Sequence, residues 1–386
     1  MRLLEINTVS YGSSVGTYML RCAEAARERG HEVTIATGRR DRAAGFENLR
    51  IGGFFPTLLH VAGTRFLDSH GLWSRRATLR FLADVRRLQP DVIHMHNIHG
   101  YYLHYPTLIE GLSGLGKPVF WSLHDCWPLT GHCAFPEECR AYTEGCGTCP
   151  RRSEYPGSWL RDGSARNYEE KSKIFGTAKN LTLLPVSDWM AGIVSESLLR
   201  DLPRLTVKPD IDIDFFRPTQ KPSGPRVVGV AQNWERRKGL DFFVRLREVL
   251  DPTIEIRLAG RAPRHGRPEG INFIGEASSE RLVDEYSRAS VFVNPTHAES
   301  YCMVNREALA CGAAVASRRA GAALENLEKS GVPVAGADTD EGLVQATIAL
   351  LKTADSDESR SAARDHAESL YAGKPGMNRL LEVMGL

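Results

Sequence analysis

The sequence alternates short apolar segments with longer amphipathic ones along most of its length, and this order restricts the fold more than any other feature. Many of the short segments carry valine and isoleucine at successive positions, as strands covered on both faces do. The longer segments show helical spacing of apolar residues and often end at a glycine, as at Gly30 and Gly312. Strands that alternate with helices build parallel, doubly wound sheets, so the sequence predicts an α/β fold.

A proline-rich segment joins two halves of this kind. Residues 201–225 contain five prolines, too many for a long helix, and a strand, a turn and a helix begin again after them. We therefore expect an N-terminal domain at 1–208, a C-terminal domain at 209–371, and a final helix at about 372–386 that packs back on the first domain. In open parallel sheets ligands bind beyond the carboxyl ends of the strands, so two such sheets facing each other would enclose a cleft. The expected strands are 3–9, 33–37, 92–96, 119–124, 181–186, 226–231, 254–259, 271–274, 291–294 and 313–316, and the expected helices are 17–29, 78–88, 240–250, 279–289 and 304–311.

Composition excludes some classes of function. The 49 lysines and arginines nearly balance 47 aspartates and glutamates, and the resulting net charge of +2 argues against a general nucleic-acid binder. The sequence has no run of about 20 apolar residues, as a membrane-spanning helix would need, and no long apolar segment typical of a signal peptide. We expect a cytoplasmic protein whose eight cysteines stay reduced.

The most informative segment is 294–312, where a strand is followed by a polar loop and by a helix that opens near Met303. The N–H groups at such a helix start, together with the helix dipole, suit a phosphate. Glu299 lies in the loop and Glu307 on the helix, and a carboxylate can accept hydrogen bonds from two neighbouring sugar hydroxyls. Taken alone, Glu307 could be an ordinary exposed helix residue; in this setting we interpret the pair as sugar-binding.

Arg237 and Lys238 follow the first strand of the second half, where a helix begins. The helix dipole repels cations at that end, so two of them there indicate a bound anion such as a diphosphate. A second loop, after the first strand of the chain, contains Gly12 and Gly16. Glycines let the backbone approach a diphosphate closely, although a tight turn explains them equally well.

Five of the eight cysteines lie in an insert at 126–150. In a reducing compartment this clustering favours a metal over disulfides. Four thiolates suit a structural, tetrahedral zinc ion, which stabilises a loop that has no core of its own. The alternatives are an iron–sulfur cluster and reduced thiols that pack as small apolar groups. The four expected metal ligands are Cys133, Cys139, Cys146 and Cys149.

Two further patterns each allow two interpretations. His94 and His96 lie on one face of a strand at its carboxyl end, where they could bind a catalytic metal or line a ligand site. Apolar residues at 73–82, interspersed with arginines, could form a helix that lies on a membrane surface or a helix whose apolar stripe faces the core. We favour the ligand site in the first case and the core in the second.

Together these motifs resemble the second domain of the retaining glycosyltransferases of family 4, which have the GT-B fold of two Rossmann-like domains facing across a cleft. The pair Glu299 and Glu307 matches the E-x7-E motif of that family, and 237–239 matches its diphosphate-binding lysine region. The first half is similar to the exopolysaccharide and colanic-acid branch in the segments HMHNIHGYY at 94–102, WSLHDCWPLTGHC at 121–133 and CGTCP at 146–150. The chain departs from the family pattern at Asn233, where an arginine is usual, and at 209–212, which replaces an Asn-Gly-Ile-Asp signature.

The resemblance implies a role for each residue of the site. His124, Lys238 and Glu299 would be the catalytic residues: His124 contacts the donor sugar near the scissile bond, Lys238 binds the diphosphate and Glu299 binds the hexose. Glu307 would bind the ribose. The acceptor would contact Asn97, His99 and Tyr101, and the donor-binding set is completed by Gly12, Gly16, Arg237, Ser300, Tyr301 and Cys302.

The implied activity is the transfer of a hexose from a UDP- or GDP-sugar to a hydroxyl of a glycan, such as a lipid-linked exopolysaccharide or antigen repeat unit. In such enzymes the anomeric configuration is retained, and a helix N-terminus with nearby cations takes the place of a catalytic metal. The expected partners are the nucleotide sugar and the glycan, and a lipid-linked acceptor would bring the protein to the inner face of the cell membrane. Two alternatives stay open: another GT-B activity such as an epimerase, and a non-catalytic partner subunit that binds a sugar nucleotide.

Overall fold

The computed structural model describes residues 1–39, 42–263 and 266–386, and these form two compact units. The first unit comprises Met1–Pro209 together with Gly376–Leu386, and the second comprises Asp210–Pro375. Within the described residues, no helix combines the length and the apolar composition that crossing a membrane requires.

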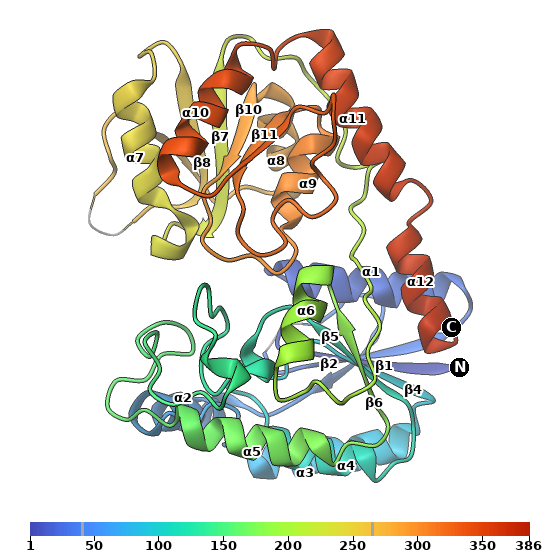
Figure 1. The fold of residues 1–386 in the computed structure, drawn as a ribbon. Coiled ribbons are helices and arrows are strands. Elements are labelled where there is room, and N and C mark those ends of the chain that lie inside the picture. The colour runs from blue at the N-terminus through green and yellow to red at the C-terminus, as the bar shows by residue number, and fades with distance from the viewer. Residues whose placement is uncertain (40–41, 264–265) are drawn as a thin grey trace. The chain divides into compact units, whose positions relative to one another are not determined.

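The sheet of the first unit has six parallel strands in the order β3-β2-β1-β4-β5-β6 (Figure 1). Helices α1 and α12 pack on one face, and α3, α4 and α5 pack on the other. The strands are β1 (Arg2–Asn7), β2 (Glu32–Thr37), β3 (Glu47–Arg50), β4 (Val92–Met95), β5 (Val119–Leu123) and β6 (Leu181–Pro185). The helices are α1 (Ser14–Glu28), α2 (Phe54–Leu67), α3 (Arg75–Leu88), α4 (Tyr105–Ser113), α5 (Ser164–Gly176), α6 (Asp188–Glu196) and α12 (Pro375–Met384).

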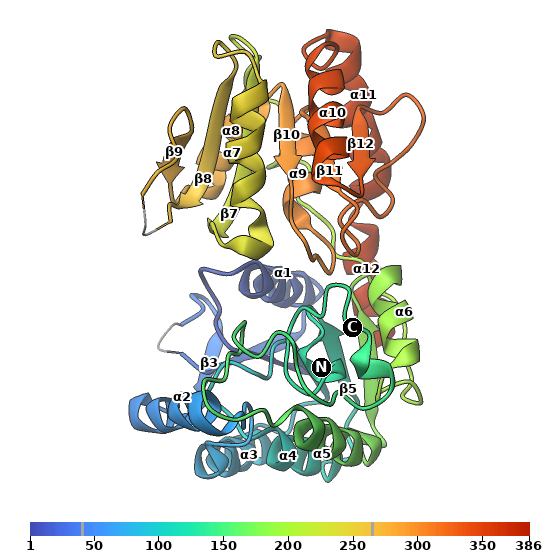
Figure 2. The same ribbon diagram turned by 60° about the vertical axis from the view of Figure 1, so that its left-hand side comes forward.

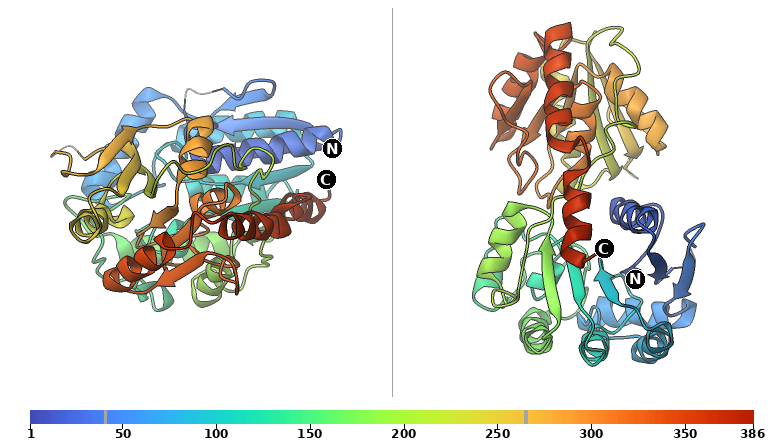
Figure 3. Two further views of the ribbon diagram at one scale, coloured as in Figure 1. Left: turned by 90° about the horizontal axis from the view of Figure 1, so that it is seen from above. Right: turned by 90° about the vertical axis from the view of Figure 1, so that its right-hand side faces the viewer.

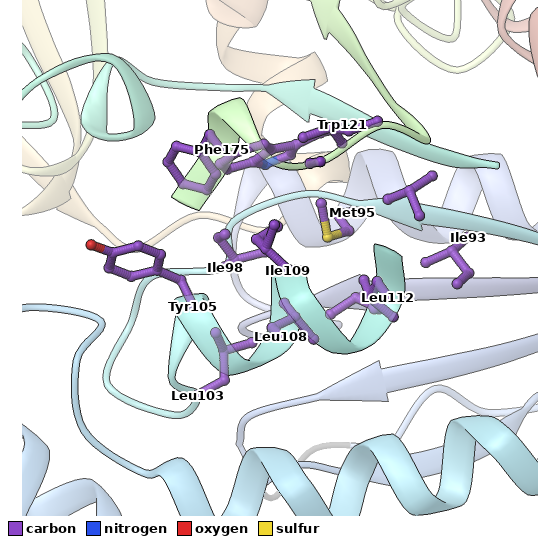
Figure 4. Packing of buried hydrophobic residues seen from close by; sticks show 14 of the residues in the cluster. Ile93, Met95, Ile98, Leu103, Tyr105, Leu108, Ile109, Leu112, Trp121 and Phe175 are labelled. Atoms are coloured by element: carbon purple, nitrogen blue, oxygen red, sulfur yellow. The ribbon is translucent and has the colours of Figure 1, made fainter. Parts of the chain in front are cut away.

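The largest buried cluster of the first unit lies on the face covered by α3, α4 and α5. Figure 4 shows Ile93 and Met95 from β4 and Trp121 from β5 above the apolar residues of α4. The Trp121 ring lies 5.1 Å from that of Phe175 on α5, and its indole N–H donates a hydrogen bond to the carbonyl oxygen of His96 at 2.7 Å. The tryptophan is therefore buried without leaving its polar atom unpaired.

The second unit repeats this architecture with six parallel strands in the order β12-β11-β10-β7-β8-β9 (Figure 2). Helices α7 and α10 pack on one face, and α8, α9 and α11 pack on the other. The strands are β7 (Arg226–Asn233), β8 (Glu255–Arg261), β9 (Asn272–Gly275), β10 (Val291–Asn294), β11 (Ala314–Arg318) and β12 (Val334–Ala337). The helices are α7 (Leu240–Val249), α8 (Ser279–Arg288), α9 (Met303–Ala310), α10 (Asp340–Leu351) and α11 (Asp357–Tyr371).

Every strand and helix expected from the sequence is present, with ends that differ by at most three residues. The α/β fold of two parallel sheets is therefore confirmed. The edge strands β3 and β12 lie outside the expected set, as do helices α2, α4, α5, α6, α10 and α11. Strand β3 has the sequence ENLR, whose charged ends suit an exposed edge and hide the apolar pattern of a strand.

Helix α3 carries the apolar stripe expected at 73–82, and the structure places it in the core: Phe81 and Leu82 are 1% and 2% exposed. The exposed apolar helix is α2, at the outer edge of the first unit (Figure 2). Its residues Phe54 and Phe55 are 67% and 75% exposed.

The final helix, α12, belongs to the first unit (Figure 3, right). Its residues Met377, Leu380 and Leu381 are buried in a cluster with Leu3 of β1 and Tyr18 of α1. Arg29 adds a hydrogen bond to Asn378 at 2.7 Å and another to the carbonyl oxygen of the last residue at 3.0 Å. The chain therefore returns to its own N-terminal sheet after completing the second unit.

We expect Leu380→Ala to lower the free energy of unfolding of the first unit by about 2–5 kcal/mol, because it leaves a cavity under α12. The matched control is Leu79→Ala on α3, where the side chain is 45% exposed and the expected loss stays below about 1 kcal/mol. Urea unfolding followed by tryptophan fluorescence measures this, because five of the six tryptophans lie in the first unit. Equal losses in the two variants would contradict the packing described.

Candidate functional site

A buried arginine holds the loop between β10 and α9. Arg306 on α9 is 0% exposed, and its guanidinium donates hydrogen bonds to the carbonyl oxygens of Tyr301, Cys302 at 3.0 Å and Glu325 at 2.8 Å. The guanidinium also lies 3.7 Å from the centre of the Tyr301 ring. Tyr301 and Cys302 are themselves buried, so these two expected donor-binding residues have side chains that pack inward. Sequence reasoning missed Arg306, because no pattern marks a single arginine as buried.

An asparagine pair joins the same loop to the sheet. Asn294, the last residue of β10, donates a hydrogen bond from Nδ2 to Oδ1 of Asn305 at 2.9 Å. Asn305 in turn donates to Ser317 Oγ at 3.1 Å and to the carbonyl oxygen of Ala323 at 2.9 Å. The start of α9 is therefore fixed relative to the carboxyl ends of β10 and β11.

Lys238 and Glu299, two of the expected catalytic residues, form an ion pair in the second unit. Lys238 ends a short 3-10 helix, η3 (Arg236–Lys238), and its Nζ donates to Glu299 Oε1. Burial raises the pKa of Glu299, but the charge and the hydrogen bond of Lys238 outweigh burial, and the net pKa is lowered. Glu299 is therefore an ionised carboxylate at neutral pH.

The two loops that carry this pair touch along their backbones. A Cβ added at Gly239, whose φ is +72°, would lie 2.6 Å from the carbonyl oxygen of Pro295. His297 donates its backbone N–H to the carbonyl oxygen of Arg237 at 2.8 Å, and Arg237 Nη1 donates to the carbonyl oxygen of Ala298 at 3.1 Å. The segment after β7 and the segment after β10 thus form one surface, and Gly239 is required by their close approach.

Glu307 and Ser300 complete the expected donor site in the second unit, and both are half-buried. Glu307 lies on α9 and accepts a hydrogen bond from the hydroxyl of the buried Tyr286 at 3.2 Å. Tyr286 thereby orients the carboxylate from the adjacent helix α8. Sequence reasoning missed Tyr286 as well as Arg306, because no sequence pattern marks either residue as a support of the site.

In the first unit, Gly12 and Gly16 have local structural roles. Gly12 has a φ of +72°, a conformation that favours glycine. Gly16 lies in the first turn of α1, where an added Cβ would meet the carbonyl oxygen of Ser10 at 2.7 Å. Its N–H donates to Ser13 Oγ at 2.9 Å, and this bond caps the helix.

His124 directly follows β5 and stacks on His96, which directly follows β4. The ring centres are 5.2 Å apart, with 21° between the ring planes, and the Tyr18 ring on α1 lies 5.5 Å from that of His124. Glu5 of β1 lies between His94 and His96 and is 0% exposed. The ligand atoms of Glu5, His94 and His96 all lie within 4.8 Å of one another, close enough to hold a metal ion together. In the described parts of the chain, no other group of three or more histidine, cysteine, aspartate or glutamate residues meets this distance. Sequence reasoning missed Glu5, and the signal that could have found it is an acidic residue inside the apolar segment LLEIN.

The expected acceptor residues lie in a second network. His99 Nε2 is 2.9 Å from Asp125 Oδ2, and His99 Nδ1 is 3.0 Å from the hydroxyl of Tyr155. Tyr101 is 9% exposed, and its hydroxyl donates to the carbonyl oxygen of Pro156 at 3.3 Å. The backbone carbonyl oxygen of Asn97 accepts a hydrogen bond from the Tyr102 hydroxyl at 2.9 Å. His99 and Tyr101 thus contact the segment that follows the insert, at Tyr155 and Pro156.

All four cysteines of the expected metal site line one small cavity in the insert, together with His132. His132 Nδ1 is 2.6 Å from Asp68 Oδ1, and its buried Nε2 has no hydrogen-bond partner. Within the described residues, no three ligand atoms of the insert lie within 4.8 Å of one another. The chemistry of the donors fits zinc, and an ion would have to draw them closer together than the structure shows.

A buried lysine holds the beginning of the insert. Lys171 of α5 is 1% exposed, and its Nζ donates to the carbonyl oxygens of Trp127 at 2.5 Å and Thr130 at 2.8 Å. The ammonium also lies 3.7 Å from the centre of the Trp127 ring. Burial lowers the pKa of Lys171 to about 7.

Both halves of the chain are similar in sequence to known glycosyltransferases. Residues 15–182 match Glycosyltransferase Family 4, and residues 224–353 match Glycosyl transferases group 1. The chain is 24% identical over 274 residues to the putative colanic acid biosynthesis glycosyl transferase WcaC of Escherichia coli (strain K12), an alignment that covers 64% of each protein. It is 27% identical over 162 residues to the D-inositol 3-phosphate glycosyltransferase of Mycolicibacterium smegmatis, in an alignment that covers 35% of each protein. The chain therefore spans less than two thirds of the length of either relative.

Solved structures with the same fold cover almost the entire chain at low identity. Sucrose-phosphate synthase from Thermosynechococcus elongatus has a TM-score of 0.73 at 14% identity, over 99% of this chain and 98% of that one. HepE from Anabaena in complex with UDP-glucose has a TM-score of 0.68 at 13% identity, over 100% and 99%. With a family 4 domain in its first half and a group 1 domain in its second, the chain belongs to the glycosyltransferases of the GT-B fold.

Proposed function

We propose that this protein transfers a hexose from a UDP- or GDP-sugar to a hydroxyl of a lipid-linked glycan, with retention of the anomeric configuration. The observation that carries the proposal is the ion pair of Lys238 and Glu299 between two loops that meet at the end of β10. A cation beside a helix start suits a diphosphate, and a carboxylate suits sugar hydroxyls.

The pair explains how one site serves both halves of a nucleotide sugar. Lys238 and Glu299 neutralise each other in this structure. A donor brings phosphates as a new partner for Lys238 and hydroxyls as new partners for Glu299. The lysine then stabilises the charge that develops on the leaving diphosphate, aided by Arg237 and the start of α9. Glu307, whose carboxylate accepts a hydrogen bond from Tyr286, is the proposed partner of the ribose hydroxyls.

Known proteins of this fold guide the choice of substrates. The HepE structure contains UDP-glucose, and the name of the WcaC relative assigns it to colanic acid biosynthesis. UDP-sugars are therefore the first donors to test, and lipid-linked polysaccharide intermediates the first acceptors. Tight donor binding without turnover, even when acceptor extracts are supplied, would instead support a non-catalytic partner subunit.

We expect slow hydrolysis of at least one member of a panel of UDP- and GDP-sugars. Lys238→Met should lower kcat/KM for that donor by about 100-fold or more, because the diphosphate loses its cation. Lys221→Met is the matched control, since Lys221 forms an ion pair with Asp357 in which both side chains are largely exposed. Unchanged turnover in Lys238→Met, measured by release of the nucleotide, would contradict the proposed site.

A lipid-linked acceptor also requires contact with a membrane, and α2 offers the surface for it. Phe54, Phe55, Leu58 and Leu59 are between 56% and 75% exposed on this one helix. Trp159 continues the apolar surface, because it is 66% exposed and its ring lies 5.7 Å from that of Phe66.

Arginines adjoin this apolar surface and would select its partner. Arg65 lies 5.6 Å from the Trp159 ring, and the exposed Arg166 donates to the carbonyl oxygen of Leu67 at 3.3 Å. Arg161, next to the exposed Leu160, is also exposed. Apolar side chains with a basic rim suit the surface of an anionic bilayer.

We expect the protein to sediment with vesicles that contain phosphatidylglycerol and to sediment less with purely zwitterionic vesicles. Phe55→Ser combined with Leu59→Ser should lower the partition coefficient about tenfold or more, because two apolar side chains no longer enter the bilayer. Val249→Ser on α7, where the side chain is 58% exposed, controls for general loss of apolar surface. Equal binding of the wild type and the double variant would exclude α2 as the contact.

The cysteine insert is expected to bind about one zinc ion per chain. Metal analysis of the purified protein should find it, and Cys149→Ser should lose it, because a structural zinc requires all four ligands. Cys22→Ala, a substitution on the buried face of α1, should retain the metal. A folded wild-type protein without metal, in which a thiol reagent titrates all four cysteines, would rule the site out.

A further inference from the structure

The cavity in the cysteine insert is lined by a histidine as well as by the four cysteines. His132 is 2% exposed, and its Nε2 atom is buried without a hydrogen-bond partner among the residues that the structure describes. Buried polar side-chain atoms nearly always have a partner, because an unsatisfied one costs free energy. The orphaned nitrogen therefore indicates that the cavity holds something that the surrounding side chains do not supply.

Asp68 decides which nitrogen of His132 carries a lone pair. Asp68 is 0% exposed, its Oδ2 accepts the backbone N–H of Gly163 at 2.7 Å, and its Oδ1 lies 2.6 Å from His132 Nδ1. A carboxylate accepts hydrogen bonds, so the imidazole donates from Nδ1 and is left with a lone pair on Nε2. Histidines that bind metals are commonly held in this way, with the other ring nitrogen donating to a carboxylate.

Three of the cysteines adjoin the backbone on either side of His132. Cys133 follows it directly, and the thiols of Cys133 and Cys149 share a hydrogen bond. On the other side, Cys146 packs on Gly131, where an added Cβ would lie 2.9 Å from the Cys146 Cβ. One lone pair and three thiols are therefore grouped around a short segment, and four such donors are the number that a tetrahedral zinc ion takes.

We propose that His132 Nε2 is a ligand of the zinc ion expected in the insert, together with the three cysteines Cys133, Cys146 and Cys149. Cys139 also lines the cavity and stays a reduced thiol. The inference rests on the zinc site of the proposed function, in which it replaces one ligand, and it does not rest on sugar transfer. Binding has to draw the four donors closer together than they lie in this structure.

The charge of the site favours the histidine over a fourth cysteine. Zinc with four thiolates carries two negative charges, whereas zinc with three thiolates and a neutral imidazole carries one. His132 and Cys133 are both buried, and a buried charge is costly in proportion to how poorly it is compensated. The ligand set with one imidazole therefore costs less to bury.

A trapped water molecule is the competing explanation of the orphaned nitrogen. Ser164 lines the same cavity, and its buried Oγ likewise has no hydrogen-bond partner within the described parts of the chain. A water between the two atoms would satisfy both. It would not require the tautomer that Asp68 imposes, because water can donate to a ring nitrogen or accept from it. The two explanations predict different effects on zinc binding when either side chain is removed.

X-ray absorption at the zinc edge tests the ligand set in the purified full chain without any variant. The expected spectrum shows three sulfur atoms at about 2.3 Å and one nitrogen atom at about 2.0–2.1 Å from the ion. Four sulfur atoms and no nitrogen would overturn the proposal and leave a zinc site made of the four cysteines.

Competition with a chelator measures the zinc affinity of the variants. His132→Ala should lower the affinity about 100-fold or more, because a ligand is lost. Cys139→Ser should keep the affinity within about threefold and leave the absorption spectrum unchanged, because its thiol does not bind the ion. Ser164→Ala is the control for the trapped water and should also keep the affinity. Unchanged affinity in His132→Ala, or loss of zinc in Cys139→Ser, would contradict the ligand set.

The outcomes separate this inference from the proposed function. A wild-type protein without zinc overturns the ligand set together with the zinc site. Sugar transfer by such a protein, measured by release of the nucleotide, would leave the proposed transferase standing. The expected spectrum in a protein that transfers no sugar would contradict the transferase and leave the ligand set standing.

Discussion

The parallel order of the strands is the constraint on which both units depend. All strands of a sheet run the same way, so their carboxyl ends meet at one edge and the loops that leave them are neighbours. This places His96 beside His124 in the first unit, although 28 positions separate them. In the second unit it places Lys238 beside Glu299 across 61 positions. Because helices cover both faces of each sheet, the strands carry mostly apolar side chains on both faces. Polar side chains are therefore concentrated at the ends of the strands.

Buried polar groups beneath these loops decide how the exposed ones are held. Arg306 binds the backbone before α9, Lys171 binds the backbone at the start of the insert, and Glu5 binds two imidazoles. A buried charge without partners is costly, so each of these groups has a set of hydrogen bonds that fixes its surroundings. The positions of Glu299 and His124 follow from that rigidity, because their own side chains are only partly enclosed.

How well the sequence predicted an element depended on how local its signal was. Strands β4, β5 and β10 and helices α3 and α9 were recognised because their apolar spacing is complete within a few residues. Edge strand β3 and helix α2 were missed, since an edge is partly polar and α2 exposes its apolar residues instead of burying them. The exposed apolar surface therefore belongs to α2 rather than α3. Both helices contain many apolar residues, so composition alone could not show which of them exposes these residues.

The sequence by itself determined the two parallel sheets and the strand–loop–helix segments, because these depend on periodicity over short distances. It also identified Lys238, Glu299 and Glu307 as candidate ligand-binding residues, because their chemistry is evident within those segments. Only the tertiary structure decided which groups are partners. It paired Lys238 with Glu299, supported His124 with His96 and Glu5, and held α9 through Arg306. The reason is physical: a hydrogen bond between distant segments depends on strand order and on burial, and neither quantity is written in the local pattern of a single chain.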